Sequence, residues 1–175
     1  SKIKWFNLRY HKYPNNLSTL YDVFRGIIIA FTILITKKIK IVHIRSYIPG
    51  LIILPLKLFF NFKLLFDMRG FWVNERLDRF GWNKKDLKYI FFKKIEKKLL
   101  FLSEKIVCLT HETKDFLINK FPNIKEKNIY QTFTTADELV FKPLYNKKIN
   151  QSVVFGYLGS VDTAYDINII FKFLK

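Results

Sequence analysis

The sequence predicts an α/β protein built on a doubly wound, Rossmann-like parallel sheet. Short β-branched runs alternate with longer stretches in which apolar residues recur at helical spacing. This alternation is typical of parallel sheets whose two faces are covered by helices. Half of the 175 residues are hydrophobic and 18% are aromatic, so the chain can bury a core and is not a disordered protein.

The strands and helices are expected to follow one another along the chain. Strands are expected at 2–9, 39–44, 63–66, 105–109 and 128–131. Helices are expected at 17–35, 49–60, 87–102 and 110–121. Thr19-x-x-Asp22 resembles a capping box near the start of the first helix, and Thr110 is a candidate N-cap for the last. The polar and aromatic segment 71–82 is assigned to neither class.

A second unit is expected after the most linker-like part of the chain, residues 145–151. The linker separates residues 1–144 from residues 152–175. Within the second unit we expect a strand at 153–158, a turn at Gly159 and Ser160, and a helix at 164–175.

The charge balance predicts attraction to polyanions, because 31 Lys and Arg oppose 14 Asp and Glu, a net charge of +17. The alternative explanation of the positive charge is gene composition, because Lys, Ile, Asn and Phe are all over-used together, as expected for an AT-rich gene. A row of lysines such as that in 84–102 is usually the solvated face of a helix. The alternative is that these lysines dock on an anionic membrane. Most aromatic residues fall on apolar faces, so we expect no nucleic-acid partner.

Other classes of protein are disfavoured by the cysteine count and the apolar runs. Cys108 is the only cysteine, and no Cys/His cluster has zinc-ligand spacing, so no metal is expected and a cytoplasmic location is the default. The uncharged apolar stretch 26–36 is shorter than the roughly 20 residues that span a bilayer.

Candidate ligand-binding residues follow the predicted strands, because ligands of such sheets bind beyond the carboxyl ends of the strands. Asp67 and Arg69 suit a hydroxyl-rich or phosphorylated ligand, and Gly70 allows the backbone to approach it closely. A structural Asp67–Arg69 pair that closes the loop is the alternative.

Further candidates lie at the other strand ends. His43 and Arg45 flank Ile44 and should point to the same side of the sheet. His111 falls in the first turn of a helix, where a capping contact is as good an explanation as ligand binding. Gly159 and Ser160 can offer backbone N–H groups to a phosphate. Their loop lacks the third Gly of a dinucleotide fingerprint and the Lys of a P-loop, which disfavours a nicotinamide dehydrogenase and a P-loop nucleotidase.

Five segments in order resemble the bacterial family 4 glycosyltransferases, which are built from two Rossmann-like domains. The segments are Ile41-Val42-His43-Ile44-Arg45-Ser46-Tyr47, Phe66-Asp67-Met68-Arg69-Gly70-Phe71-Trp72, Ile106-Val107-Cys108-Leu109-Thr110, Thr135-Ala136-Asp137-x-x-x-Phe141-Lys142-Pro143 and Phe155-Gly156-Tyr157-Leu158-Gly159-Ser160. Many members of the family have a His where this chain has Arg69, a group that stays charged.

The resemblance implies that 1–144 is an acceptor-binding domain and that 152–175 is the first strand and helix of a truncated donor-binding domain. It implies transfer of a sugar from a nucleotide-diphosphate sugar to a glycan or lipid-linked acceptor in cell-envelope polysaccharide synthesis. The nucleotide sugar would be a substrate, and no cofactor is implied. A peripheral position on the inner face of the membrane is compatible with this role. The competing interpretation is a non-catalytic basic α/β module that binds nucleic acid or an anionic membrane.

Overall fold

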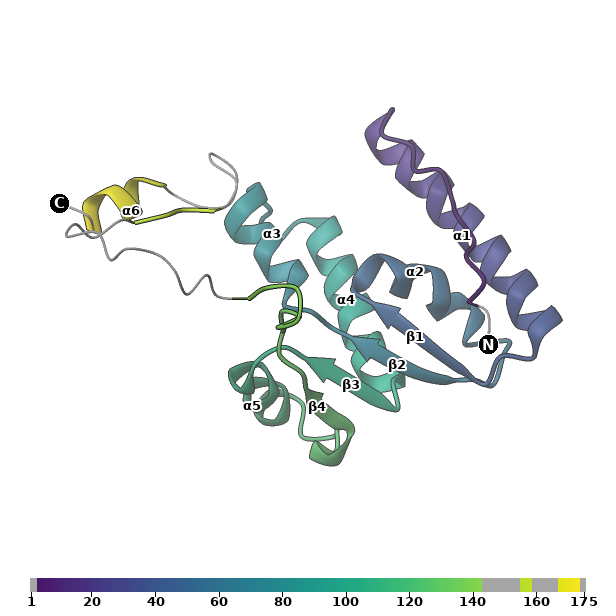
Figure 1. The fold of residues 1–175 in the computed structure, drawn as a ribbon. Helices are drawn as coiled ribbons and strands as arrows, with labels where there is room; N and C mark the ends of the chain where they lie inside the picture. The colour runs from purple at the N-terminus through teal and green to yellow at the C-terminus, as the bar shows by residue number, and fades with distance from the viewer. Residues whose placement is uncertain (1–2, 143–154, 159–166, 174–175) are drawn as a thin grey trace.

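A four-stranded, all-parallel sheet forms the centre of the molecule (Figure 1). The computed structural model describes residues 3–142, 155–158 and 167–173. The strands are β1 (Ile41–Arg45), β2 (Lys63–Asp67), β3 (Lys105–Cys108) and β4 (Ile129–Gln131). The α/β class and the parallel sheet are confirmed, and this architecture is compatible with a Rossmann-like fold. The strand order β1-β2-β3-β4 follows the sequence, so the part described shows winding in one direction only.

Helices connect the strands as a parallel sheet requires. The helices are α1 (Asn15–Lys37), α2 (Tyr47–Leu56), α3 (Trp72–Phe80), α4 (Leu87–Leu102), α5 (His111–Lys120) and α6 (Ile167–Phe173), with a short 3₁₀ turn η1 (Glu126–Asn128) before β4. Thr110 caps α5 as predicted, because its hydroxyl accepts a hydrogen bond from the Thr113 backbone N–H at 3.2 Å.

The two faces of the sheet differ sharply in burial. The strand register aligns Ile44, Phe66, Ile106 and Ile129 in one row, and each of these side chains is at most 3% exposed. This apolar row belongs to the core that also includes residues of α2 and α4. The row on the opposite face is Arg45, Asp67, Val107 and Tyr130, and all four residues are half-buried or exposed. Covering helices on both faces were predicted; in the residues described, only one face is fully buried.

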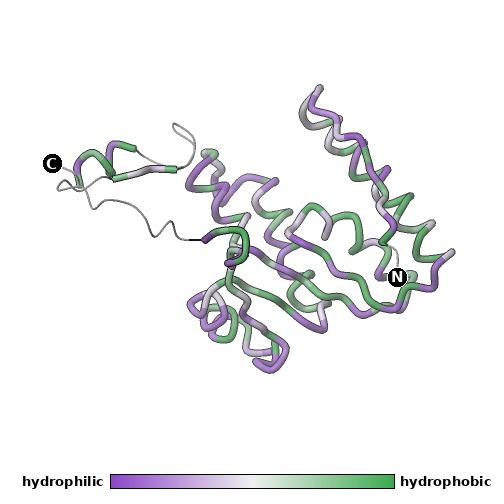
Figure 2. Tube along the Cα trace, viewed as in Figure 1, coloured by the Kyte–Doolittle hydropathy of each residue, from purple (hydrophilic) through white to green (hydrophobic). Residues whose placement is uncertain are grey.

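Helix α1 packs on α2 along one side and is otherwise exposed. A Cβ on Gly26 would come within 2.6 Å of the Ile52 side chain, so the two helices approach closely there. Leu34 is buried, and Phe31 and Phe60 make an edge-to-face contact at 5.5 Å. Figure 2 shows hydrophobic residues along much of α1, and the stretch Leu17–Lys37 is long and apolar enough to cross a membrane by length and composition. The sequence-based expectation considered only the uncharged core of this stretch and therefore underestimated its length.

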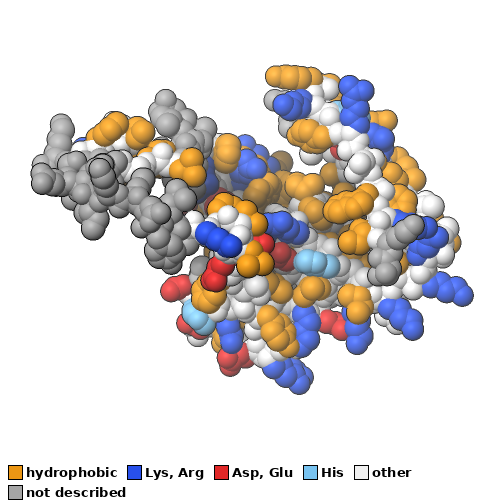
Figure 3. All heavy atoms as spheres, in the orientation of Figure 1, with side chains coloured by type: hydrophobic (Ala, Val, Ile, Leu, Met, Phe, Trp, Pro, Cys, Tyr) orange, Lys and Arg blue, Asp and Glu red, His pale blue; other side chains and the backbone are white. Residues whose placement is uncertain are grey.

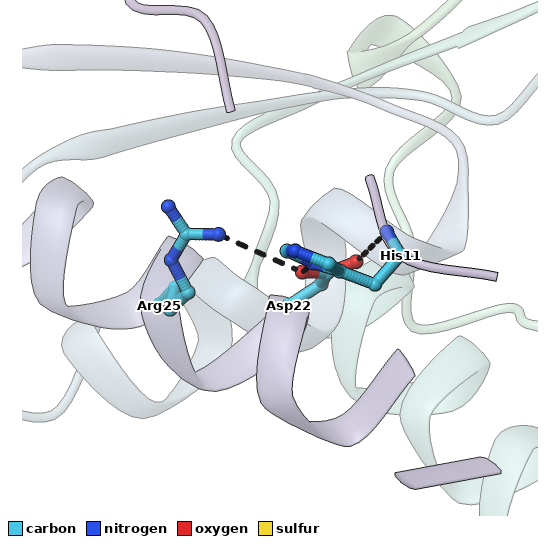
Figure 4. A network of polar contacts seen from close by, with 3 residues as sticks. All are labelled: His11, Asp22 and Arg25. Carbon is cyan, nitrogen blue, oxygen red and sulfur yellow. Dashed lines mark hydrogen bonds and ion pairs between the residues drawn. The ribbon is translucent and has the colours of Figure 1, made fainter. Parts of the chain in front are cut away.

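The chain before α1 is not the strand predicted at 2–9. Residues 3–9 have no assigned secondary structure and are exposed, since no described strand lies beside them to form a ladder. The capping box is also wrong, because α1 begins at Asn15 and Asp22 lies inside it. Asp22 instead accepts hydrogen bonds from the His11 backbone N–H at 2.8 Å and meets the His11 ring at 2.7 Å, with Arg25 on its other side (Figure 4).

Two further expectations need correction. Helix α3 lies within the segment 71–82, where none was predicted, and Gly81 caps its end in the left-handed conformation. Its Arg76 guanidinium lies 4.6 Å from the Trp72 ring centroid and 4.2 Å from that of Phe80, one turn to either side. Residues 155–158 form no strand, whereas α6 lies within the helix predicted at 164–175. The linker 145–151, Gly159 and Ser160 lie outside the described residues.

Candidate functional site

Three of the predicted site residues meet at the carboxyl ends of β1 and β2. The parallel register places Arg45 directly beside Asp67. His43 lies two residues earlier on the same face, and its Nε2 is 4.0 Å from the Asp67 Oδ2. All three therefore lie on the face of the sheet opposite the apolar row, as the alternation of side chains along a strand requires.

Asp67 is the least exposed member of this group, with 14% of its side chain accessible. Its Oδ1 is buried and has no hydrogen-bond partner in the structure. Among the residues described, Asp67 makes no ion pair with Arg69, so the alternative of a loop-closing pair is not what the structure shows. Buried carboxylate oxygens are normally hydrogen-bonded, and an unpaired one is a candidate contact for a ligand donor.

Both strand ends continue into turns with unusual backbone conformations. Ser46 follows β1 with φ 70° and ψ −172°, a region that is almost restricted to glycine. Arg69 has φ 58°. Non-glycine residues held in such conformations cost roughly 1–3 kcal/mol each and are common at ligand sites. The Ser46 N–H donates to the Asp67 carbonyl at 2.8 Å, which joins the two turns.

Tyr47 contacts the loop that follows β2 and was not among the predicted site residues. Its side chain is fully buried, and its hydroxyl is 3.1 Å from the Gly70 carbonyl and 3.0 Å from Glu96 Oε2. Burial raises the pKa of Tyr47 well above its ordinary value, and the neighbouring Glu96 carboxylate adds to the rise. Tyr47 therefore stays protonated and acts as a hydrogen-bond donor that positions the loop. The sequence showed only an aromatic residue at the start of a helix, which gives no signal of this contact.

The backbone conformation of Gly70 favours glycine, and its neighbour leaves little space for a side chain. Its φ is 156°, and a Cβ there would lie 3.0 Å from the Glu75 carboxylate. The Gly70 N–H also donates to the Met68 carbonyl at 2.7 Å, which tightens the turn. The positive φ agrees with a sharp backbone turn at this glycine, and close approach of the backbone to a ligand stays a prediction.

His111 lies in a different hollow. It is exposed at the start of α5, and its ring contacts Phe133 at 5.8 Å between centroids. The hollow, of about 580 Å³, is also lined by Lys114, Lys127 and Gln131. The structure therefore separates His111 from the group formed by His43, Arg45 and Asp67.

Two other groups near strand ends have shifted pKa values. Burial raises the pKa of the Cys108 thiol, so this cysteine remains a protonated core side chain rather than a nucleophile. The Glu112 carboxylate has a lowered pKa because its own backbone N–H and the Thr110 hydroxyl donate to it at the start of α5.

The side chains of His43, Arg45 and Asp67 at the ends of β1 and β2 offer hydrogen-bonding groups to a polar ligand. No cluster of three or more His, Cys, Asp or Glu side chains suited to a metal ion occurs in the described part of the chain. A carboxylate with a free acceptor lies beside an imidazole and an arginine, and Arg69 follows on the loop. Carboxylates accept hydrogen bonds from hydroxyls, and arginines donate to phosphates, so both kinds of ligand group find a complement here.

Fold and site together define an α/β protein with an all-parallel sheet and a polar group of side chains at the carboxyl ends of two adjacent strands. No model of a known protein family matches the chain, and a search of curated proteins finds no match either.

Proposed function

We propose that residues 1–144 form the acceptor-binding part of a glycosyltransferase that uses a nucleotide-diphosphate sugar. The observation that carries this proposal is the unpaired, buried Oδ1 of Asp67 between two turns with disfavoured backbone conformations. A ligand that supplies a hydroxyl donor would satisfy that oxygen and offset the cost of burying it.

The neighbouring side chains suit the chemistry of sugar transfer. Asp67 would accept a hydrogen bond from a sugar hydroxyl, and His43 and Arg45 would flank it. Arg69 would face the departing diphosphate, where a fixed guanidinium stabilises developing negative charge. Such catalysis needs positioning and charge neutralisation more than covalent chemistry.

The order of the five segments that resemble family 4 glycosyltransferases supports the same proposal. Three of them fall wholly in the described part up to Lys142, and the fourth does so except for Pro143. Asp67, Arg69 and Gly70 lie in the second. Residues 152–175 would open the donor-binding domain, with Gly159 and Ser160 near the donor phosphates.

Saturation-transfer NMR tests this proposal with the protein and two probe panels, UDP- and GDP-sugars and simple oligosaccharides. We expect saturation of sugar protons in at least one panel. Asp67→Asn removes the negative charge of the side chain that accepts the hydrogen bond. Arg69→Lys removes the planar set of N–H groups of the guanidinium. Each should weaken binding roughly 10- to 100-fold, the effect of losing one charge-assisted hydrogen bond.

The matched control is Asp115→Asn, which neutralises an exposed carboxylate on α5. It should bind like the unmodified protein. Absence of saturation with both panels, or equal weakening by Asp67→Asn and Asp115→Asn, would overturn the proposal.

A further inference from the structure

An apolar groove of about 600 Å³ lies between α2 and α4, away from the group at the strand ends. Its walls come from Leu51 and Pro55 on one side and from Phe91, Ile95 and Leu102 on the other. Among the residues described, Lys98 is the only charged residue that lines it.

Helix α4 is apolar on two sides, which explains why the groove remains open. Leu99 and Leu100 are buried in the core. Leu87, Phe91, Ile95 and Leu102 recur at helical spacing on another face, where Leu87 is 85% and Phe91 is 51% exposed. A helix that needs only one apolar face for its own core does not require this second stripe.

The apolar surface continues at the end of α2. Leu58 and Phe59 follow that helix and are 82% and 77% exposed, and Leu58 also lines the groove. Contiguous exposed apolar surface of this kind is typical of sites that bind a partner or a membrane.

The charge around the stripe is positive. Lys94, Lys97 and Lys98 are exposed on α4, whereas the exposed Lys88 lies 3.8 Å from the carboxylate of Asp86 at the N-cap. Glu96, the one acidic residue within α4, is buried and is held by Lys93 and Tyr47. After the N-cap, the outward surface of α4 therefore carries lysines and apolar side chains without a carboxylate. Long lysine side chains lie along apolar surface while their ammonium groups reach polar groups.

We propose that the stripe of α4, together with Leu58, docks on the surface of an anionic lipid bilayer. The apolar side chains would enter the boundary between headgroups and acyl chains, and the lysines would meet the lipid phosphates. The protein lies on the membrane in this arrangement and does not span it. Docking requires no sugar ligand, so its test is independent of the test of the proposed function.

Helix α1 is the element that could span a bilayer instead, since its length and composition would allow it. Its close approach to α2 at Gly26, its buried Leu34 and its Phe31–Phe60 contact would all be lost if it left the domain. A surface-bound protein is released from vesicles by alkaline carbonate, whereas a spanning helix is retained, so the two arrangements are distinguishable.

The test is co-sedimentation with vesicles of phosphatidylcholine, with and without about one third phosphatidylglycerol. We expect binding only to the anionic vesicles, weakening steeply with salt as the screening length falls below about 10 Å. Replacing Lys94, Lys97 and Lys98 by Gln should reduce the partition coefficient on the order of 100-fold. Phe91→Ser combined with Leu58→Ser should reduce it roughly 10-fold or more without changing the charge.

The matched control replaces Lys120, Lys125 and Lys127 by Gln, which removes the same charge from exposed positions on and after α5. Its binding should remain within a few-fold of the original, and circular dichroism should show all variants folded. Absent vesicle binding, equal loss in the two triple variants, or retention after carbonate washing would each overturn the proposal.

Discussion

The two faces of the central sheet show how one set of strands serves two purposes. On one face Ile44, Phe66 and Ile106 are almost inaccessible to water and pack with the helices. On the other face, Arg45 and Asp67 occupy adjacent positions in the register with an exposed His43 beside them. Parallel sheets normally have both faces covered.

The difference in burial indicates which residues are fixed by packing and which are free to serve binding. A buried apolar side chain is determined by the volume around it. A half-exposed polar side chain on the opposite face contributes little to the core, so its identity needs another explanation. Figure 3 shows Lys and Arg side chains scattered among hydrophobic ones over the visible face of the molecule.

The largest expected effect separates the two faces directly. Phe66→Ala should lower the free energy of unfolding by about 3–5 kcal/mol, because it opens a cavity beside Tyr47, whose ring lies 5.7 Å away. Leu65→Ala, one residue earlier and half-buried on the opposite face, should cost about 1 kcal/mol. Urea denaturation of both variants measures the two values. Equal losses would show that the second face is packed as tightly as the first.

A smaller effect is expected at the turn after β1. Ser46→Gly should raise the free energy of unfolding by about 1 kcal/mol, because glycine adopts this conformation without the steric cost that serine bears. The same urea titration checks it, alongside Ser103→Gly, a position with an ordinary extended backbone where the change should destabilise. A less stable Ser46→Gly variant would show that the Ser46 side chain stabilises the fold.

The smallest effect concerns a carboxylate that belongs to neither face. Hydrogen bonds from the backbone and side chain of His11 lower the pKa of Asp22 below its ordinary value of 3.8. Its contribution to stability is therefore complete above that ordinary value and is lost as the pH falls through the lowered value. The advantage in melting temperature of the unmodified protein over Asp22→Asn should shrink as the pH drops below 3.8. A constant difference across that range would show that the charge of Asp22 plays no part.

The sequence predicted the repeating elements better than the contacts between them. Strands β1 to β4, helices α1, α2, α4 and α5, and the cap at Thr110 follow from apolar spacing and local capping chemistry. Helix α3 was missed because it is stabilised by Arg76 lying against Trp72 and Phe80, a contact that has no apolar period. The strand predicted at 2–9 has a suitable pattern, but a strand also needs a neighbour, and sequence pattern alone does not supply one.

The candidate site was predictable to a similar degree. The rule that ligands bind beyond the carboxyl ends of parallel strands selected His43, Arg45 and Asp67 from the sequence. The unpaired oxygen of Asp67, the separation of His111 and the role of Tyr47 all depend on distances between segments that are far apart in the chain, and local sequence does not encode these.

The hydroxyl of Tyr47 has one hydrogen and two acceptors within reach, at Gly70 and at Glu96. Since a single proton is directed at one acceptor at a time, rotation about the C–O bond decides whether the hydroxyl donates to Gly70 in the loop or to Glu96 on α4. Lys93 holds the other oxygen of Glu96, Oε1, and leaves Oε2 to the Tyr47 hydroxyl. The Gly70 carbonyl and the Glu96 carboxylate, 26 positions further along the chain, therefore depend on the same phenolic proton.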